Sequence, residues 1–208
     1  MPEVLNSVII SMAEKPLKTR FPGFIIHSAR SALLKKSWLP ILLAFVLPVI
    51  LVYAWWGGFN SVRIEQGERG PYTYAYLAHT GSYATLPDTQ YQVLQALRAQ
   101  GITPGESINV LFDDPRHVPP KQLHANTGYT VRSGDIIRAP LQRGEIPRRA
   151  VLLARVKAAE RFAPSKTYQA LYDYLKAQHR DITMPTVELY ATPTEIYRVG
   201  EFTVEMQQ

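Results

Sequence analysis

The chain contains no cysteine among its 208 residues. It therefore forms no disulfide, offers no thiol nucleophile and has no thiolate ligand for a metal, and its redox compartment is left open. Two common catalytic loops are missing as well. The segment "GERG" at 67–70 has neither the spacing nor the lysine of a phosphate loop, and "HTGSY" at 79–83 lacks the G-x-S-x-G pattern that exposes a nucleophilic serine.

An excess of positive charge is also missing from most of the chain. The net charge of +6 is uneven, because residues 1–59 hold six Lys/Arg and two Glu, whereas residues 60–208 hold seventeen Lys/Arg and fifteen Asp/Glu. The larger part is close to neutral, without the basic footprint of a nucleic-acid-binding domain. We expect no nucleic-acid partner.

One long uncharged run is present, "SWLPILLAFVLPVILVYAWWGGFNSV" at 37–62. It is long enough to cross about 30 Å of hydrocarbon as a helix, and tryptophans stand near both ends, where interfacial aromatics are common. The run predicts an uncleaved membrane anchor over 37–60, behind a tail at 1–36. Because all six Lys/Arg of the first 59 residues precede it, we expect a single-pass protein with a cytoplasmic N-terminus and an extracytoplasmic domain over 61–208.

The rest of the chain contains an internal repeat. "YQVLQAL" at 91–97 resembles "YQALYDYL" at 168–175, and "INVLFDDP" at 108–115 resembles "TVELYATP" at 186–193. In each copy, apolar residues at helical spacing precede an alternating strand that stops at a proline. Further alternating segments before and after these predict six strands in all, the other four at 72–81, 125–131, 149–156 and 201–206.

The predicted fold is α+β, with two strand-helix-strand-strand modules and an antiparallel sheet. The first module covers 62–132, a connection covers 133–149, and the second module covers 150–206. The segments "AYLAHTGSY" (75–83), "FDDPRHVPPKQL" (112–123) and "VELY" (187–190) resemble the GyrI-like small-molecule-binding domain of the effector-binding superfamily. The resemblance implies SHS2-type modules related by a pseudo-twofold, with a small-molecule pocket between them.

The architecture departs from that of GyrI-like regulators, which carry a DNA-binding helix-turn-helix where this chain has its apolar run. It is similar to that of the membrane-anchored GyrI-like receptor for autophagy of the endoplasmic reticulum, which implies a possible protein partner. That receptor keeps its domain in the cytosol, against the charge bias of this chain.

The segment "VLFDDPRHVPP" at 110–120 looks chemically dense but predicts a turn. On an extended strand Asp113 and Asp114 point to opposite faces, so they cannot flank one bond as a general acid and base. His117 has no second histidine at a ligand spacing. We expect a structural turn, with a ligand-contacting rim or chemistry as the alternatives, and we expect no metal and no cofactor.

Glu188 is the leading candidate for a binding residue. Alternation places it on one strand face with Thr186 and Tyr190, and the repeat pairs its position with Val110. A buried carboxylate is costly without a cation or hydrogen-bond donors, although an exposed glutamate on a wet sheet face is an alternative. The resemblance implies that the acid at this position meets cationic ligands. The predicted ligand-binding residues are Glu188, Tyr190, Tyr83, Tyr76 and Phe112.

The sequence therefore predicts a membrane-anchored domain that binds a small amphipathic ligand, cationic or aromatic, as a sensor or a sequestering module without catalysis. Two alternatives stay open. One is a hydrolase of reactive small molecules that uses Glu188 to activate water, and the other is a module that docks a protein partner.

Overall fold

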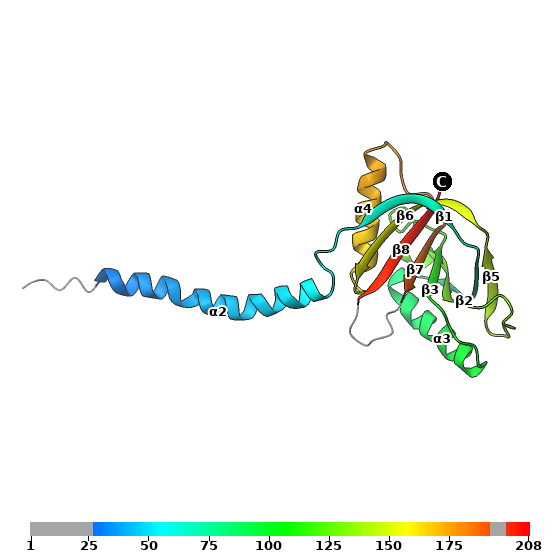
Figure 1. The fold of residues 1–208 in the computed structure, drawn as a ribbon, viewed down its shortest axis with the longest axis horizontal. Coiled ribbons are helices and arrows are strands. Elements are labelled where there is room, and N and C mark those ends of the chain that lie inside the picture. Colours follow the sequence, from blue (N-terminus) through cyan, green and yellow to red (C-terminus); the bar gives the residue numbers. More distant parts are fainter. Residues whose placement is uncertain (1–26, 192–198) are drawn as a thin grey trace, which may run out of the picture. The chain divides into compact units, whose positions relative to one another are not determined.

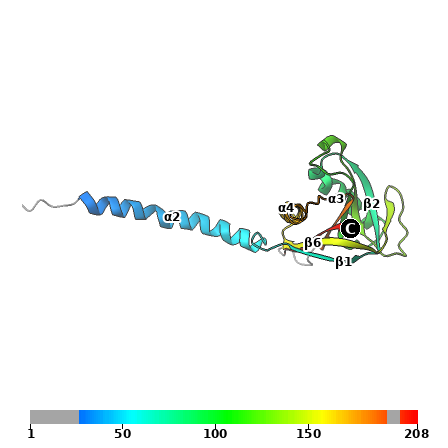
Figure 2. The same ribbon diagram turned by 90° about the horizontal axis from the view of Figure 1, so that it is seen from above.

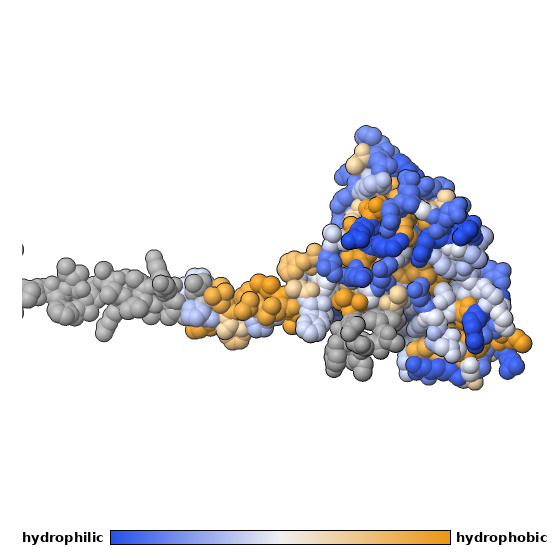
Figure 3. All heavy atoms as spheres, in the orientation of Figure 1, coloured by the Kyte–Doolittle hydropathy of each residue, from blue (hydrophilic) through white to orange (hydrophobic). Residues whose placement is uncertain are grey.

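The computed structural model describes residues 27–191 and 199–208, so most of the predicted tail lies outside the described residues. Its contacts divide the chain into two units, residues 1–47 and residues 48–208. The long helix α2, His27–Trp55, begins in the first unit and ends in the second. Many of its described apolar side chains are exposed, and Figure 3 shows them as a largely orange surface.

In the described part of the chain, no helix is both long enough and apolar enough to cross a membrane. The anchor predicted over 37–60 is therefore not supported, and the predicted orientation stays a prediction.

The last residues of the predicted anchor pack against the folded domain. The ring of Trp56 lies 5.9 Å from that of Phe162, and its backbone carbonyl accepts a hydrogen bond of 2.9 Å from the Ala159 amide. Asn60 donates through Nδ2 to the Lys157 carbonyl at 2.6 Å. These aromatic and polar groups therefore find partners among the residues of the folded domain.

Eight strands form one antiparallel sheet in the order β1-β6-β8-β7-β3-β4-β2-β5 (Figure 1). Two helices of equal length pack on it, α3 (Leu86–Ala99) and α4 (Ala163–Lys176). The strands are β1 (Arg63–Arg69), β2 (Tyr72–Thr80), β3 (Ser107–Leu111), β4 (His124–Thr130), β5 (Gln142–Ile146), β6 (Arg149–Ala158), β7 (Thr186–Ala191) and β8 (Gly200–Gln207).

The α+β class, both predicted helices and all six predicted strands are confirmed, in the predicted order, whereas the division into two modules stays a prediction. Strands β1 and β5 were not predicted, and β5 lies inside the connection at 133–149. Both are mostly exposed and polar, so they lack the apolar alternation that marks a strand in a sequence. The pseudo-twofold relation between the modules stays a prediction.

Both helices cover the same face of the sheet (Figure 2). Residues directly opposite each other in paired strands share a face. The strand registers form one such row across the sheet, which runs Ala75, Tyr129, Ser107, Tyr190, Phe202 and Val156. Ala75 packs in the cluster with Val93 and Leu97 of α3, while Phe202 and Val156 pack in the cluster with Leu171 and Leu175 of α4.

The opposite face of the sheet folds on itself. Its apolar side chains are buried without a covering helix, among them Tyr74, Ile108, Val110, Val187 and Leu189. The chain connections require this curl, because two residues join β1 to β2 and two join β5 to β6, although each pair lies far apart in the strand order. These two connections, residues 70–71 and 147–148, come close together at Gly70. Its φ is +89°, and a Cβ added at this position would lie 2.9 Å from the Pro147 carbonyl oxygen.

A buried carboxylate stabilises the curled sheet by hydrogen bonds to residues of three other strands. Glu205 of β8 is fully buried, and its Oε1 accepts hydrogen bonds from Arg69 Nε at 2.9 Å and from the Tyr72 hydroxyl at 2.6 Å. Its Oε2 accepts from Arg149 Nη2 at 2.9 Å. Burial and the hydrogen bond to Glu205 raise the pKa of Tyr72 to about 12. The cluster thus joins β1, β2, β6 and β8.

Candidate functional site

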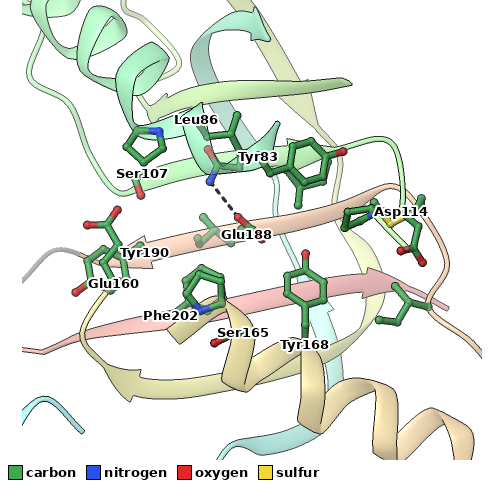
Figure 4. A pocket seen from close by; sticks show the side chains of 18 of the residues that line it. Tyr83, Leu86, Ser107, Asp114, Glu160, Ser165, Tyr168, Glu188, Tyr190 and Phe202 are labelled. Carbon is green, nitrogen blue, oxygen red and sulfur yellow. Dashed lines mark hydrogen bonds between the residues drawn. The ribbon is translucent and has the colours of Figure 1, made fainter. Parts of the chain in front are cut away.

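A cavity of about 670 Å³ lies between α3 and α4, over the two central strands β3 and β7 (Figure 4). Its volume is within the range of pockets that hold small organic ligands. Most of its wall is apolar or aromatic, including Leu86, Leu111, Ile182, Met184, Phe202, Tyr83, Tyr168, Tyr172 and Tyr190.

The packing of the helices leaves this space open. Helix α3 packs on β2 and β4, and α4 packs on β6 and β8, so neither covers the centre of the sheet. The register there places Asn109 opposite Glu188 and Ser107 opposite Tyr190, and all four side chains line the cavity. The floor of the pocket is therefore set by the pairing of β3 with β7.

Glu188 lies in this floor and is only 7% exposed. Its Oε2 accepts a hydrogen bond of 3.0 Å from Asn109 Nδ2, drawn dashed in Figure 4. Asn109 is held in turn by Thr127, whose hydroxyl donates to Asn109 Oδ1 at 2.6 Å. Burial raises the pKa of Glu188 above its usual value, and polar contacts from Asn109 and Tyr168 oppose this only in part. Among the described residues, no cation pairs with it.

Two tyrosines flank the carboxylate. The Tyr168 hydroxyl lies 2.9 Å from Thr186 Oγ1, and burial together with the charge of Glu188 raises the pKa of Tyr168 well above its usual value. Tyr83 is fixed by the backbone of the β3–β4 connection, since its hydroxyl donates to the Asp113 carbonyl at 2.9 Å. Both side chains reach the pocket from elements outside the sheet.

The aspartate pair at the end of β3 forms the predicted turn. Asp114 Oδ1 accepts from the Arg116 amide at 2.8 Å, and Asp113 Oδ2 accepts from the His124 amide at 2.8 Å. Burial alone would raise the pKa of Asp114, but the hydrogen bonds from Arg116 lower it below its usual value. Asp114 and Arg116 also line the cavity, so the segment is at once a turn and part of the pocket rim.

Arg116 connects this turn with the segment after α4. Its Nη2 donates to Asp181 Oδ1 at 2.7 Å as well as to Asp114, and its guanidinium lies 4.9 Å from the centre of the Tyr172 ring. Arg116, Asp114, Asp181 and Tyr172 therefore form a clasp at one end of the pocket.

The structure brings together only part of the predicted binding set. Glu188, Tyr190 and Tyr83 line the cavity, whereas Tyr76 and Phe112 do not. Tyr76 lies on the opposite face beside Tyr74, with ring centres 5.3 Å apart, because alternation turns it away from the helices. Phe112 follows the last residue of β3 and is 44% exposed outside the lining.

The repeat-based pairing of Glu188 with Val110 is also wrong. Val110 lies opposite Val187 on the curled face, and Asn109 is the residue across from Glu188. The residues that face the helices have odd numbers in β3 and even numbers in β7. The repeat offset of 78 residues is even, so it pairs Glu188 with a residue on the opposite face of the sheet. Sequence reasoning likewise missed Asn109, Tyr168 and Tyr172, although the four-residue spacing of the two tyrosines on α4 was a usable signal.

Within residues 27–191 and 199–208, no group of three or more His, Asp or Glu side chains could hold a metal ion. The titratable groups of the pocket are instead spread along its wall, with Asp114 and Arg116 in the clasp, Glu188 in the floor and Glu160 in the turn before α4.

A family model described as the GyrI-like small-molecule-binding domain matches residues 62–207. The chain belongs to the GyrI-like family. The match covers all eight strands of the sheet and both helices that frame the pocket, so this is a small-molecule-binding domain. No curated protein matches the chain.

Two solved structures, both of EcmrR, show the same fold. The EcmrR C-terminal domain is 10% identical with a TM-score of 0.56, over 70% of this chain and 96% of that one. EcmrR in a DNA complex is 11% identical with a TM-score of 0.54, and the match covers 86% of this chain and 70% of that one. SAV2435 bound to tetraphenylphosphonium is 9% identical with a TM-score of 0.49, and the match covers 70% of this chain and 93% of that one. The absence of a nucleic-acid partner for this chain stays a prediction.

Proposed function

We propose that this GyrI-like domain binds a small, amphipathic, aromatic cation and acts as a sensor or a sequestering module. The observation that carries the proposal is Glu188, a carboxylate that is 7% exposed in the floor of an aromatic cavity. Among the described residues it receives one hydrogen bond from Asn109 and has no cationic partner.

The chemistry of the wall supports a positive ligand. Burying an unpaired carboxylate is unfavourable, and a bound cation offsets part of that cost. The charged residues of the lining are three acids and one arginine, and Arg116 is already paired with Asp114. The tyrosine rings add cation-π contacts of about 0.5 to 2 kcal/mol each. The apolar wall contacts the rest of the ligand.

The test compares a permanent flat cation with a neutral analogue. We expect Glu188→Gln in the full chain to weaken binding of 10-methylacridinium by about 2 to 4 kcal/mol, roughly 30-fold to 1000-fold. Binding of neutral acridine at pH 8 should change little, because the substitution keeps the shape and removes the charge. Fluorescence titration measures both affinities.

A matched control is Glu145→Gln, which removes an exposed carboxylate of β5 outside the pocket. It should leave both affinities unchanged. Equal weakening of the cation and the neutral analogue in the Glu188 variant contradicts charge recognition, and so does an unchanged affinity for the cation.

A hydrolase is the second candidate, and the raised pKa of Glu188 favours it. A carboxylate with a raised pKa is a better general base near neutral pH. Incubation with a cyclopropane-bearing electrophile should then give hydrolysed product with the wild-type chain and none with Glu188→Gln. Binding without turnover supports the first proposal.

Membrane attachment through residues 37–60, with the domain outside the cytoplasm, also stays a proposal from the sequence. The uncharged run and the Lys/Arg bias before it support this arrangement. Carbonate extraction of membranes, followed by protease treatment of intact spheroplasts, tests the attachment and the orientation.

A further inference from the structure

We propose that the pocket recognises ligands with two positive charges, and that Glu160 binds the second charge while Glu188 binds the first. The inference rests on the proposed function, because it adds a second cation-binding residue to the same cavity. Glu160 belongs to the turn between β6 and α4 and lines the pocket with Glu188.

Glu160 lies at one end of the cavity, next to Tyr190 (Figure 4). It is exposed, and no ion pair joins it to a cation among the described residues. The Tyr190 ring beside it also lines the pocket, and aromatic rings attract organic cations. The carboxylate is thus free to meet a charged group of a ligand at this end of the pocket.

The charged residues of the pocket wall fall into two groups, those with an ion-pair partner and those without one. At the clasp, Arg116 pairs with Asp114 and Asp181, so that end is already occupied by an internal ion-pair network. Glu160 and Glu188 have no such partner in the described part of the chain. Two unpaired carboxylates in one cavity fit a ligand with two cationic groups better than a ligand with one.

The strand geometry sets the expected spacing of those groups. Glu188 and Tyr190 lie on the same face of β7, two residues apart, which corresponds to about 7 Å along the strand. Because Glu160 lies beside Tyr190 (Figure 4), we expect its carboxylate to lie about one such step from that of Glu188. An aromatic ring with one ammonium group at each end spans such a step, as in para-xylylenediamine.

Glu160 has a competing structural role, because it stands just before α4, which begins at Ala163. A carboxylate near a helix N-terminus stabilises the helix through its dipole. That role predicts a lower stability of Glu160→Gln and no selective effect on a ligand with two charges. The ratio of affinities for two matched probes separates the two roles.

The experiment titrates the full chain with para-xylylenediamine and with 4-methylbenzylamine, which keeps the ring and loses one charge. We expect the wild type to prefer the dication by about 3-fold to 10-fold, a modest factor because Glu160 is exposed. Glu160→Gln should abolish that preference and change the affinity for the monocation less than 2-fold. Glu188→Gln should weaken both probes.

The two proposals fail in different ways. No preference for the dication in the wild type, no binding of it at millimolar concentration, or an equal loss of both probes in Glu160→Gln overturns the second site. If Glu188→Gln leaves the monocation affinity unchanged, the proposed function itself fails. A lower melting temperature of Glu160→Gln with the preference intact assigns Glu160 to the helix dipole instead.

Discussion

The protonation state of Glu188 controls the charge that the pocket presents to a ligand. Burial raises its pKa, so it takes up a proton at a pH where an ordinary glutamic acid, with a pKa near 4.3, is still ionised. Only the ionised form of Glu188 attracts a cation through its charge, and protonation therefore removes that part of the attraction.

This gives a prediction at the scale of one residue. The affinity for 10-methylacridinium, whose charge does not titrate, should fall as the pH decreases through the raised pKa of Glu188. The fall should begin at a higher pH than an ordinary glutamate would produce. Fluorescence titrations from pH 8 downward measure it, and the Glu188→Gln variant should give a flat profile. A pH dependence that survives in this variant assigns the titration to another group.

The pH dependence of folding stability has the opposite direction to that of cation affinity. Because the folded-state pKa is raised, the ionised carboxylate binds protons less readily in the unfolded chain, so folding loses stability as the pH rises from the ordinary value to the raised one. The empty Glu188→Gln variant should accordingly be as stable as the wild type at neutral pH, or more stable.

At the scale of elements, the clasp joins the β3–β4 connection to the segment after α4. Arg116 makes ion pairs with Asp114 and Asp181 and lies over the ring of Tyr172, while its side chain is 37% exposed. Partly exposed ion pairs stabilise little, so its larger effect should be on the opening of the pocket end.

We expect Arg116→Gln to lower the free energy of unfolding by about 0.5 to 1.5 kcal/mol and to speed the release of bound 10-methylacridinium several-fold. Urea denaturation and stopped-flow dissociation measure the two effects. The control is Arg132→Gln, which removes a more exposed ion pair with Asp135 outside the pocket and should change neither quantity appreciably. An unchanged release rate in the Arg116 variant argues against a clasp.

At the scale of the whole molecule, the curl of the sheet depends on Glu205. Its partners come from β1, β2 and β6, of which β1 and β6 are neighbours at one edge of the sheet and β2 lies near the other edge. If the carboxylate is neutralised, Arg149, whose side chain is 12% exposed, keeps a buried charge without its partner. Loss of one member of a buried pair is strongly destabilising.

Glu205→Gln should therefore lower the free energy of unfolding by about 2 to 4 kcal/mol, measured by urea denaturation. Ligand affinity of the folded variant should hold, because Glu205 lies outside the pocket lining. Glu201→Gln on the same strand is the matched control, since its ion pair with Arg155 is long, at 3.7 Å, and partly exposed. Equal stability losses in the two variants contradict the role of Glu205 in the closure.

The elements whose signals are local could be located from the amino-acid sequence alone. Helical spacing and alternation located α3, α4 and six strands, and the order of residues at Asp114 and Pro115 indicated a turn. Glu188 stood out because a carboxylate between apolar strand neighbours is unusual. These features depend on neighbours within a few positions along the chain, which a sequence displays directly.

Which side chains share the pocket depends on the three-dimensional packing of the strands and helices. Asn109 faces Glu188 through the register of β3 with β7, whereas Tyr76 falls outside because a shift of one residue turns a strand side chain to the other face. Phe112 falls outside because it follows the last residue of β3. The polar strands β1 and β5 join the sheet through pairing with partners far along the chain. Glu160 reaches the pocket from a turn. Such contacts arise from long-range packing, which no local pattern encodes.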